Sequence, residues 1–160
     1  MDDLAEKIIE KMQKSKKTFA IAESFTGGLL SDSFVKVPGA SKAFLGSVIA
    51  YSNNVKNSIL GVSNSVLNKD GAVSSKAALE MAKGVREKLG SDIGISTTGI
   101  AGPDNQEGKQ VGLIYVAVAA DNFEQVQEFV IENKGRQFIR LSGVDKAQKM
   151  LYTYINGESL

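Results

Sequence analysis

Apolar and polar positions follow two different periods along the chain, which predicts helices and strands in alternation. Apolar residues recur every three to four positions at 3–15, at 75–89 and from about residue 137 onward, and each run predicts a helix with one buried face. Short helices are expected over 27–37, where Pro38-Gly39 ends the pattern, and over 54–60, where Gly61 ends it. Continuously apolar runs predict buried strands, and a more polar run predicts a strand nearer an edge. The predicted buried strands are residues 18–22, 44–52, 92–100 and 111–119, and the more polar one is 123–131.

Alternation of helices with buried strands is typical of a sheet that helices cover on both faces. The runs at 111–119 and 123–131 are separated by a short turn, so this part of the sheet is expected to be antiparallel. We therefore predict a three-layer α/β/α sandwich with a mixed, mostly parallel sheet, built as a single domain over residues 1–160.

The amino-acid composition excludes some kinds of partner and active site. The chain has 160 residues and a net charge of +1, without the basic stripe that a nucleic-acid binder normally shows. It contains neither Cys nor His, which excludes a thiolate nucleophile and disulfides and argues against a transition-metal site. Without a signal region or an apolar run of membrane-spanning length, we expect a cytoplasmic protein that contacts no membrane.

Two predicted strands run into similar loops of glycines and hydroxyl residues. "ESFTGG" (23–28) follows the first strand, and "TGIAGP" (98–103) follows the strand that begins at residue 92. Loops at the carboxyl ends of neighbouring strands line the ligand crevice of α/β folds, and glycine lets backbone N–H groups approach an anion. Each loop alone has a structural explanation: Ser24 or Thr26 could cap a helix, and the glycines could serve a turn. Two such loops in one small domain favour a ligand crevice.

A serine nucleophile in this chain needs a base other than histidine. Lysine can serve when burial lowers its pKa, and "AYSNNVKNSILG" (50–61) offers Tyr51 at a strand end and Lys56 about one helical turn later. Glu23 is the poorer partner of Ser24, because consecutive strand residues point to opposite faces. Spacing alone leaves open that Lys56 is a surface lysine and that Tyr51 belongs to the edge of the core.

The motifs together resemble those of a known family, the C-terminal domain of the competence/damage-inducible protein A. The matching strings, in order, are "AES-TGG" (22–28), "VPGAS" (37–41), "AYSN--K" (50–56), "LGV" (60–62), "GAVS" (71–74), "TGIAGP" (98–103), "K-VG" (109–112) and "GR--IR" (135–140). Enzymatic members of this family are nicotinamide-nucleotide amidohydrolases. The resemblance implies hydrolysis of the carboxamide of nicotinamide mononucleotide to nicotinic acid mononucleotide and ammonia, in pyridine nucleotide recycling, without metal or cofactor.

The resemblance also implies roles for individual residues. Ser24 corresponds to the nucleophile, with Tyr51 and Lys56 as the groups that handle its proton, and Arg136 or Arg140 could pair with the nucleotide phosphate. Backbone N–H groups around Thr26 and Gly27 are expected to stabilise the oxyanion. The residues expected to line the substrate site are Thr26, Gly27, Ser41, Gly46, Thr98, Gly99, Gly102, Arg136 and Arg140. Phe25 departs from the family, which often has Cys there, and Gln110 stands where Pro is common.

Two other functions remain open from the sequence: a catalytically silent nucleotide-binding or regulatory module, and an interaction partner in competence or DNA damage. A homo-oligomer is expected, with the exposed face of the 75–89 helix or of the C-terminal helix as the contact.

Overall fold

The computed structural model describes residues 2–158 and arranges them in three layers. Five strands form the central sheet in the order β2-β1-β3-β4-β5. The strands are β1 (Phe19–Glu23), β2 (Phe44–Ile49), β3 (Ile93–Gly99), β4 (Leu113–Ala120) and β5 (Phe123–Val130). The helices are α1 (Asp2–Ser15), α2 (Leu29–Val35), α3 (Asn53–Ser58), α4 (Asn64–Lys69), α5 (Ser75–Leu89) and α6 (Arg136–Ile155), with a 3₁₀ turn η1 (Ala40–Lys42).

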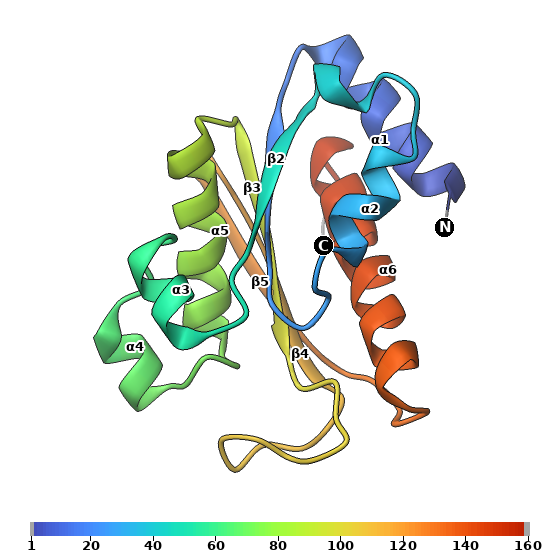
Figure 1. Cartoon of the computed structure of the whole chain (residues 1–160). Helices are drawn as coiled ribbons and strands as arrows, with labels where there is room; N and C mark the ends of the chain where they lie inside the picture. Colours follow the sequence, from blue (N-terminus) through green and yellow to red (C-terminus); the bar gives the residue numbers. More distant parts are fainter. Residues whose placement is uncertain (1, 159–160) are drawn as a thin grey trace.

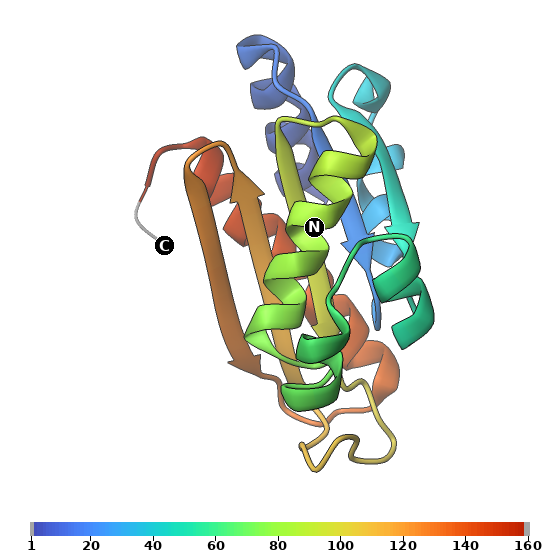
Figure 2. The same ribbon diagram turned by 90° about the vertical axis from the view of Figure 1, so that its left-hand side faces the viewer.

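Helices cover both faces of the sheet, as the alternating pattern predicts. α5 lies across one face with α3 and α4 beside it, and α1, α2 and α6 pack on the other face (Figure 1). Figure 2 shows α5 in front of the sheet, with the strands behind it. The α/β/α sandwich is thus confirmed.

The sheet is mixed. β1 pairs in parallel with β2 and with β3, whereas β4 is antiparallel to β3 and to β5. Four of the five strands therefore point the same way, and only β4 runs against them. The antiparallel pairing of β4 with β5 and the edge position of β5 are both as predicted.

Burial explains why α1 and β1 form where they do. Ala5, Ile8, Ile9 and Met12 line one face of α1 and are almost completely buried against the sheet. All five residues of β1 are buried, because this strand has neighbours on both sides and helices on both faces.

Three expectations about local structure need correction. β2 is an edge strand rather than a buried one, and its side chains alternate between partly buried and exposed. α2 begins at Leu29, two residues later than predicted, because Gly27 and Gly28 adopt φ values of 55° and 99° that a helix does not use. α4 has no counterpart among the predicted elements; Ser63 caps it by accepting a hydrogen bond from the N–H of Val66.

Candidate active site

The carboxyl ends of β1 and β3 lie side by side, which brings the two glycine-rich loops together. These strands pair in parallel, with Glu23 beside Thr97, and the backbone N–H of Ser24 donates to the carbonyl of Thr97 at 3.0 Å. On the other side, the carbonyl of Glu23 accepts from the N–H of Ala50, where β2 ends, at 2.7 Å. Ser24 thus stands where three parallel strands end, the position at which α/β folds bind ligands.

Glu23 fixes the turn that carries Ser24. Its fully buried carboxylate accepts hydrogen bonds from the N–H groups of Gly28, Leu30 and Ser31 at 3.0, 3.1 and 2.9 Å. The first amides of α2, which lack helical partners, are therefore capped by Glu23. Neither Ser24 nor Thr26 is the helix cap that the sequence left as an alternative; Gly28 holds that position.

Ser24 is instead paired with Lys56. The amine Nζ lies 3.0 Å from Ser24 Oγ and donates to the carbonyl of Ala50 at 2.8 Å. Lys56 is 1% exposed, so it is not the surface lysine that its spacing also allowed. Burial lowers its pKa from 10.5 to about 8, because the charged form loses its hydration, while the charge of Glu107 acts in the opposite direction. A serine next to a lysine with a lowered pKa is the arrangement that nucleophilic catalysis without histidine requires.

Backbone N–H groups after Ser24 are the candidate oxyanion donors. The N–H of Gly27 already donates to the carbonyl of Ser24 at 3.1 Å, so it is not available in this conformation. This turn leaves the N–H groups of Phe25 and Thr26 as the candidates. The residue after the nucleophile supplies such a donor in other hydrolases as well.

The two arginines expected at the nucleotide differ in their contacts. Arg140 donates through Nε to the carbonyl of Phe25 at 3.0 Å and through Nη2 to the carbonyl of Thr26 at 2.9 Å. Arg136 is exposed and donates to Tyr51 Oη at 2.7 Å and to the carbonyl of Gly102 at 2.5 Å. Arg140 therefore holds the Ser24 turn, whereas Arg136 and Tyr51, both exposed, form a rim beside the loop that contains Gly102.

Tyr51 does not join the Ser24–Lys56 pair directly. Tyr51 is 61% exposed, and in the described part of the chain its hydroxyl accepts a hydrogen bond from Arg136. The structure thus separates the two groups that the sequence proposed as proton handlers.

Hydroxyl and glycine residues of the predicted site have mostly structural contacts. Thr26 Oγ1 lies 2.8 Å from Thr97 Oγ1 in the interior, and Thr98 Oγ1 donates to the carbonyl of Ala72 at 2.7 Å. A Cβ on Gly99 would lie 2.5 Å from Ile114, so close packing against β4 requires glycine there.

Two predicted residues lie elsewhere in this chain. Ser41 is exposed in η1, ahead of β2, and Gly46 pairs with Ala20 near the start of β1. Because β1 and β2 run in parallel, Ser41 is at the end of the sheet opposite Ser24, about 15 Å away along the strands. Within one chain these two positions do not contribute to the crevice.

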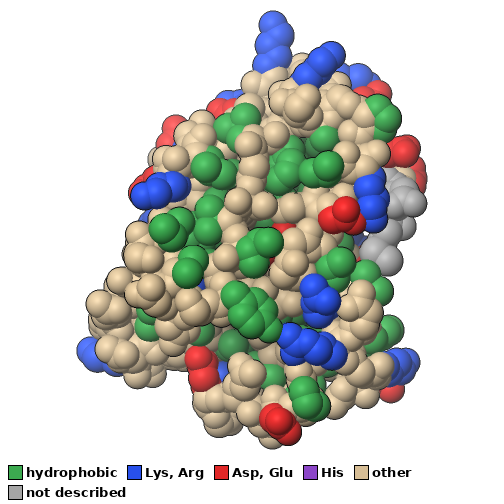
Figure 3. Space-filling model, viewed as in Figure 1, with side chains coloured by type: hydrophobic (Ala, Val, Ile, Leu, Met, Phe, Trp, Pro, Cys, Tyr) green, Lys and Arg blue, Asp and Glu red, His purple; other side chains and the backbone are tan. Residues whose placement is uncertain are grey.

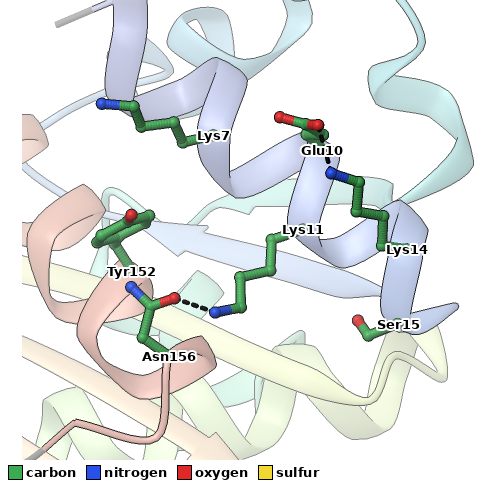
Figure 4. Close-up of a pocket in the computed structure, with 7 residues that line it drawn as sticks. All are labelled: Lys7, Glu10, Lys11, Lys14, Ser15, Tyr152 and Asn156. Atoms are coloured by element: carbon green, nitrogen blue, oxygen red, sulfur yellow. Dashed lines mark hydrogen bonds and ion pairs between the residues drawn. The ribbon is translucent and has the colours of Figure 1, made fainter.

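A cavity of about 550 Å³ between α1 and α6 is separate from this site (Figure 4). It is lined by Lys7, Glu10, Lys11, Lys14, Ser15, Tyr152 and Asn156. Lys7 and Lys14 form ion pairs with acidic residues one helical turn earlier, and Lys11 donates to Asn156. These contacts satisfy the lysines without a ligand.

Residues 2–158 offer neither a metal site nor a membrane-spanning helix. No group of three acidic, His or Cys side chains there could hold a metal ion. No helix in the same part of the chain is long and apolar enough to cross a membrane.

Comparison with known proteins agrees with this fold. Residues 1–155 match the family model described as the CinA C-terminal domain. A CinA-like protein of Pseudothermotoga lettingae is 46% identical over 125 residues, which is 78% of this chain and 31% of that protein. A CinA-like protein of Dictyoglomus thermophilum is 43% identical over 154 residues, 96% of this chain and 35% of that protein. The chain thus spans about a third of the length of these relatives.

A solved structure extends the similarity to three dimensions. The competence/damage inducible protein CihA of Agrobacterium tumefaciens is 34% identical, with a TM-score of 0.92 over 97% of this chain and 94% of that one.

Proposed function

Since the chain belongs to the CinA C-terminal domain family, we propose that it is a nicotinamide-nucleotide amidohydrolase with a serine nucleophile. The substrate is the one that the sequence resemblance implies, nicotinamide mononucleotide, and the products are nicotinic acid mononucleotide and ammonia. The observation that carries the proposal is the buried Lys56 amine at 3.0 Å from Ser24 Oγ, with its pKa lowered to about 8. Burial of an amine without a carboxylate partner is costly, which supports a role for Lys56 beyond its hydrogen bond to the carbonyl of Ala50.

The hydrogen bonds of Lys56 suggest how the proton moves. A neutral amine has two N–H groups and one lone pair, and the carbonyl of Ala50 takes one of the N–H groups. With that contact in place, the lone pair can turn toward Ser24 and accept its O–H. The hydrogen bond that the ammonium donates to Ser24 thereby reverses, and the base is the neutral lysine.

Hydrolysis then takes place in two stages. Ser24 Oγ attacks the carboxamide carbon as its proton passes to Lys56, and the oxyanion is held by the N–H groups of Phe25 and Thr26. Lys56 returns the proton to the nitrogen as the C–N bond breaks, which releases ammonia and leaves an ester on Ser24. Water then attacks that ester as its proton passes to Lys56, and Lys56 gives this proton to Ser24 Oγ as the ester C–O bond breaks and the carboxylic acid leaves.

The rim supplies recognition of the nucleotide. Arg136 is the exposed arginine at the crevice, and a phosphate would replace Tyr51 or the Gly102 carbonyl as its partner. Arg140 supports the reaction differently, by holding the carbonyls of Phe25 and Thr26 so that their turn keeps its shape.

An ammonia-release assay with nicotinamide mononucleotide tests the proposal. We expect turnover by the wild type and a loss of at least about 100-fold for Ser24→Ala, because an activated nucleophile contributes that much or more. Ser47→Ala, at an exposed serine of β2, is the matched control and should leave the rate unchanged. Turnover by Ser24→Ala equal to the wild type would contradict the covalent mechanism. Binding of the nucleotide without turnover by the wild type would favour the silent binding module.

We also propose that the chain forms a homo-oligomer, through β2 rather than α5 or α6. Leu45 and Ile49 of this edge strand are 45% and 50% exposed, and apolar side chains gather on this side of the molecule (Figure 3). No charged residue protects the edge between Lys42 and Lys56. Sedimentation should show less self-association for Ile49→Lys, and unchanged self-association for Val130→Lys at the opposite edge.

A further inference from the structure

The connection between β3 and β4 carries a tight hairpin whose tip has an unusual residue. Gln106 and Lys109 pair across it, with hydrogen bonds of 3.1 and 2.7 Å in the two directions. Between them, Glu107 and Gly108 have φ values of 54° and 70°. Such two-residue turns favour Asn, Asp or Gly, since other residues are strained at positive φ. Glutamate at the first position therefore indicates that its side chain has a specific role.

The side chain of Glu107 binds the segment that leads into α5. One carboxylate oxygen accepts from the N–H of Ala72 at 2.9 Å, and the other accepts from the N–H of Val73 at 3.2 Å. Lys109 completes the attachment, because its Nζ donates to the carbonyls of Asp70 and Val73 at 2.7 and 2.6 Å.

The attachment leaves no room for a side chain at Gly71. A Cβ there would lie 2.2 Å from a Glu107 carboxylate oxygen and 3.1 Å from Lys109 Nζ. The hairpin tip and this segment are thus packed in direct contact.

The segment so held belongs to the wall of the candidate active site. Ala72 and Val73 are buried, and the carbonyl of Ala72 accepts from Thr98 Oγ1, at the end of β3, at 2.7 Å. The hairpin, the segment before α5 and the end of β3 are therefore tied into one unit. From this position the negative charge of Glu107 reaches the Lys56 amine, where it favours the protonated form.

Other charged or titratable groups lie on the elements next to the candidate site. They are Tyr51 after β2, Asp70 at the end of α4, Lys76 and Glu80 of α5, Lys109 of the hairpin and Arg136 of α6. Most are engaged locally: Asp70 pairs with Lys76, Glu80 accepts from the N–H of Ser63, and Arg136 donates to Tyr51. Among these groups of the described chain, the negative charge of Glu107 favours the protonated form of Lys56.

We propose that Glu107 is a positioning residue of the site, which anchors the 103–110 hairpin to the segment before α5 and so holds the wall that Ala72 and Thr98 form. The inference rests on the proposed Ser24–Lys56 chemistry. Burial is the main cause of the lowered pKa of Lys56, and the negative charge of Glu107 acts against it, so loss of this charge is expected to lower the pKa further.

Titration of Lys56 tests the proposal without any substrate. NMR of ¹³C-labelled lysine reports the titration midpoint of Lys56, which we expect near pH 8 in the wild type and at lower pH in Glu107→Gln. The glutamine keeps an acceptor for the segment but removes the charge. Asp104→Asn is the matched control, because Asp104 is an exposed carboxylate of the same hairpin loop, and it should leave the midpoint in place.

Amide hydrogen exchange tests the anchoring separately. In Glu107→Ala the N–H groups of Ala72 and Val73 lose their charged acceptor, and exchange there should be roughly tenfold faster or more. Glu107→Asp keeps the charge on a shorter side chain and serves as a second variant, with intermediate protection expected if the alanine variant does not fold.

The outcomes separate this inference from the proposed function. An unchanged Lys56 midpoint in Glu107→Gln, or an equal decrease in Asp104→Asn, overturns the electrostatic role of Glu107. Unchanged exchange at Ala72 and Val73 overturns the anchoring role. Absence of amide hydrolysis by the wild type would refute the proposed reaction and leave both of these measurements as they stand.

Discussion

Replacement of Lys56 by methionine is expected to stabilise the protein while abolishing its proposed activity. Lys56 is 1% exposed, and methionine has a similar length and no charge. The burial that lowers the pKa of this lysine is a free-energy cost to the folded state whenever the amine is protonated. Removal of the amine removes that cost.

The size of the effect follows from the two pKa values. A lysine with a pKa of 10.5 in the unfolded chain and about 8 in the folded one destabilises the native state by about 3 kcal/mol at pH 7. This contribution to the free energy of unfolding has the opposite sign to that of a salt-bridged lysine. The cost is fully present below pH 8 and is lost as the pH rises from 8 to 10.5, because over this range the unfolded chain binds the proton that the folded one has released.

Loss of the hydrogen bonds of the Lys56 amine reduces the stabilisation expected for Lys56→Met. Lys56→Met leaves the carbonyl of Ala50 and the hydroxyl of Ser24 without their partner, at a cost of about 1 kcal/mol each. We therefore expect a net stabilisation of about 1–2 kcal/mol at pH 7 and a net destabilisation at pH 10, with about 2.5 kcal/mol between the two conditions.

Urea unfolding of wild type and variant at pH 7 and pH 10 measures this difference. Comparison of the two proteins at each pH cancels the titration of all other groups, provided that they do not interact with Lys56. Lys88→Met, at an exposed lysine of α5, is the control and should show a much smaller change with pH. If the stability difference between wild type and Lys56→Met were the same at both pH values, Lys56 would have an ordinary pKa and the reasoning about the base would be wrong.

Three further predictions concern the same site. The rate kcat/KM for nicotinamide mononucleotide should rise with pH to a midpoint at about 8, where Lys56 loses its proton, and a flat profile from pH 6 to 9 would exclude it as the base. Gly143→Ala should lower the free energy of unfolding in urea by about 1–3 kcal/mol and reduce kcat, because its Cβ would lie 2.4 Å from the Phe25 ring, next to Ser24, the proposed nucleophile. Phe25→Leu in the same chain should recover part of the stability and part of kcat. Arg136→Met should raise KM by about tenfold and leave the free energy of unfolding within about 0.5 kcal/mol of the wild type. Arg140→Met should lower the free energy of unfolding by at least about 1 kcal/mol and should also lower kcat. The opposite pattern would exchange the roles of the two arginines.

Elements whose burial follows from their own residues could be predicted from the sequence. α5 was predicted at its observed bounds, since its apolar positions repeat over four turns and Gly90 ends it in the left-handed conformation. The position of β2 could not be predicted in this way, because "FLGSVI" is as apolar as a central strand and only the strand order places it at the edge. α4 has six residues, too few for a helical period to show.

Part of the candidate site could also be predicted from the sequence, and part depends on tertiary contacts. Ser24 and Lys56 could be proposed from the sequence because each follows a recognisable strand end, and parallel pairing brings those ends together. The separate roles of Arg136 and Arg140 could not be predicted from the sequence. One helical turn separates the two residues, and only the packing of α6 decides which of them reaches the Ser24 turn. The role of Glu107 likewise depends on a contact across 35 residues that no local pattern shows.

The absence of histidine has a physical consequence for how this site is built. An imidazole with an ordinary pKa near 6.5 needs little from its surroundings to act as a base at neutral pH, whereas an ordinary lysine is almost entirely protonated there. Under the proposed mechanism the fold must therefore bury the amine of Lys56, at the loss in stability that burial brings. That loss also explains why the surrounding turn is so firmly held: the buried carboxylate of Glu23 caps α2 on one side of Ser24, and Arg140 binds the carbonyls that follow it. If either anchor were loosened, the Ser24 turn could move away from Lys56 and let water reach the amine, whose pKa would rise toward 10.5. The rigidity of the Ser24 turn thus keeps the pKa of Lys56 low. Variants at Glu23 or Arg140 should therefore shift the pH profile of kcat/KM to higher pH and also lower the rate.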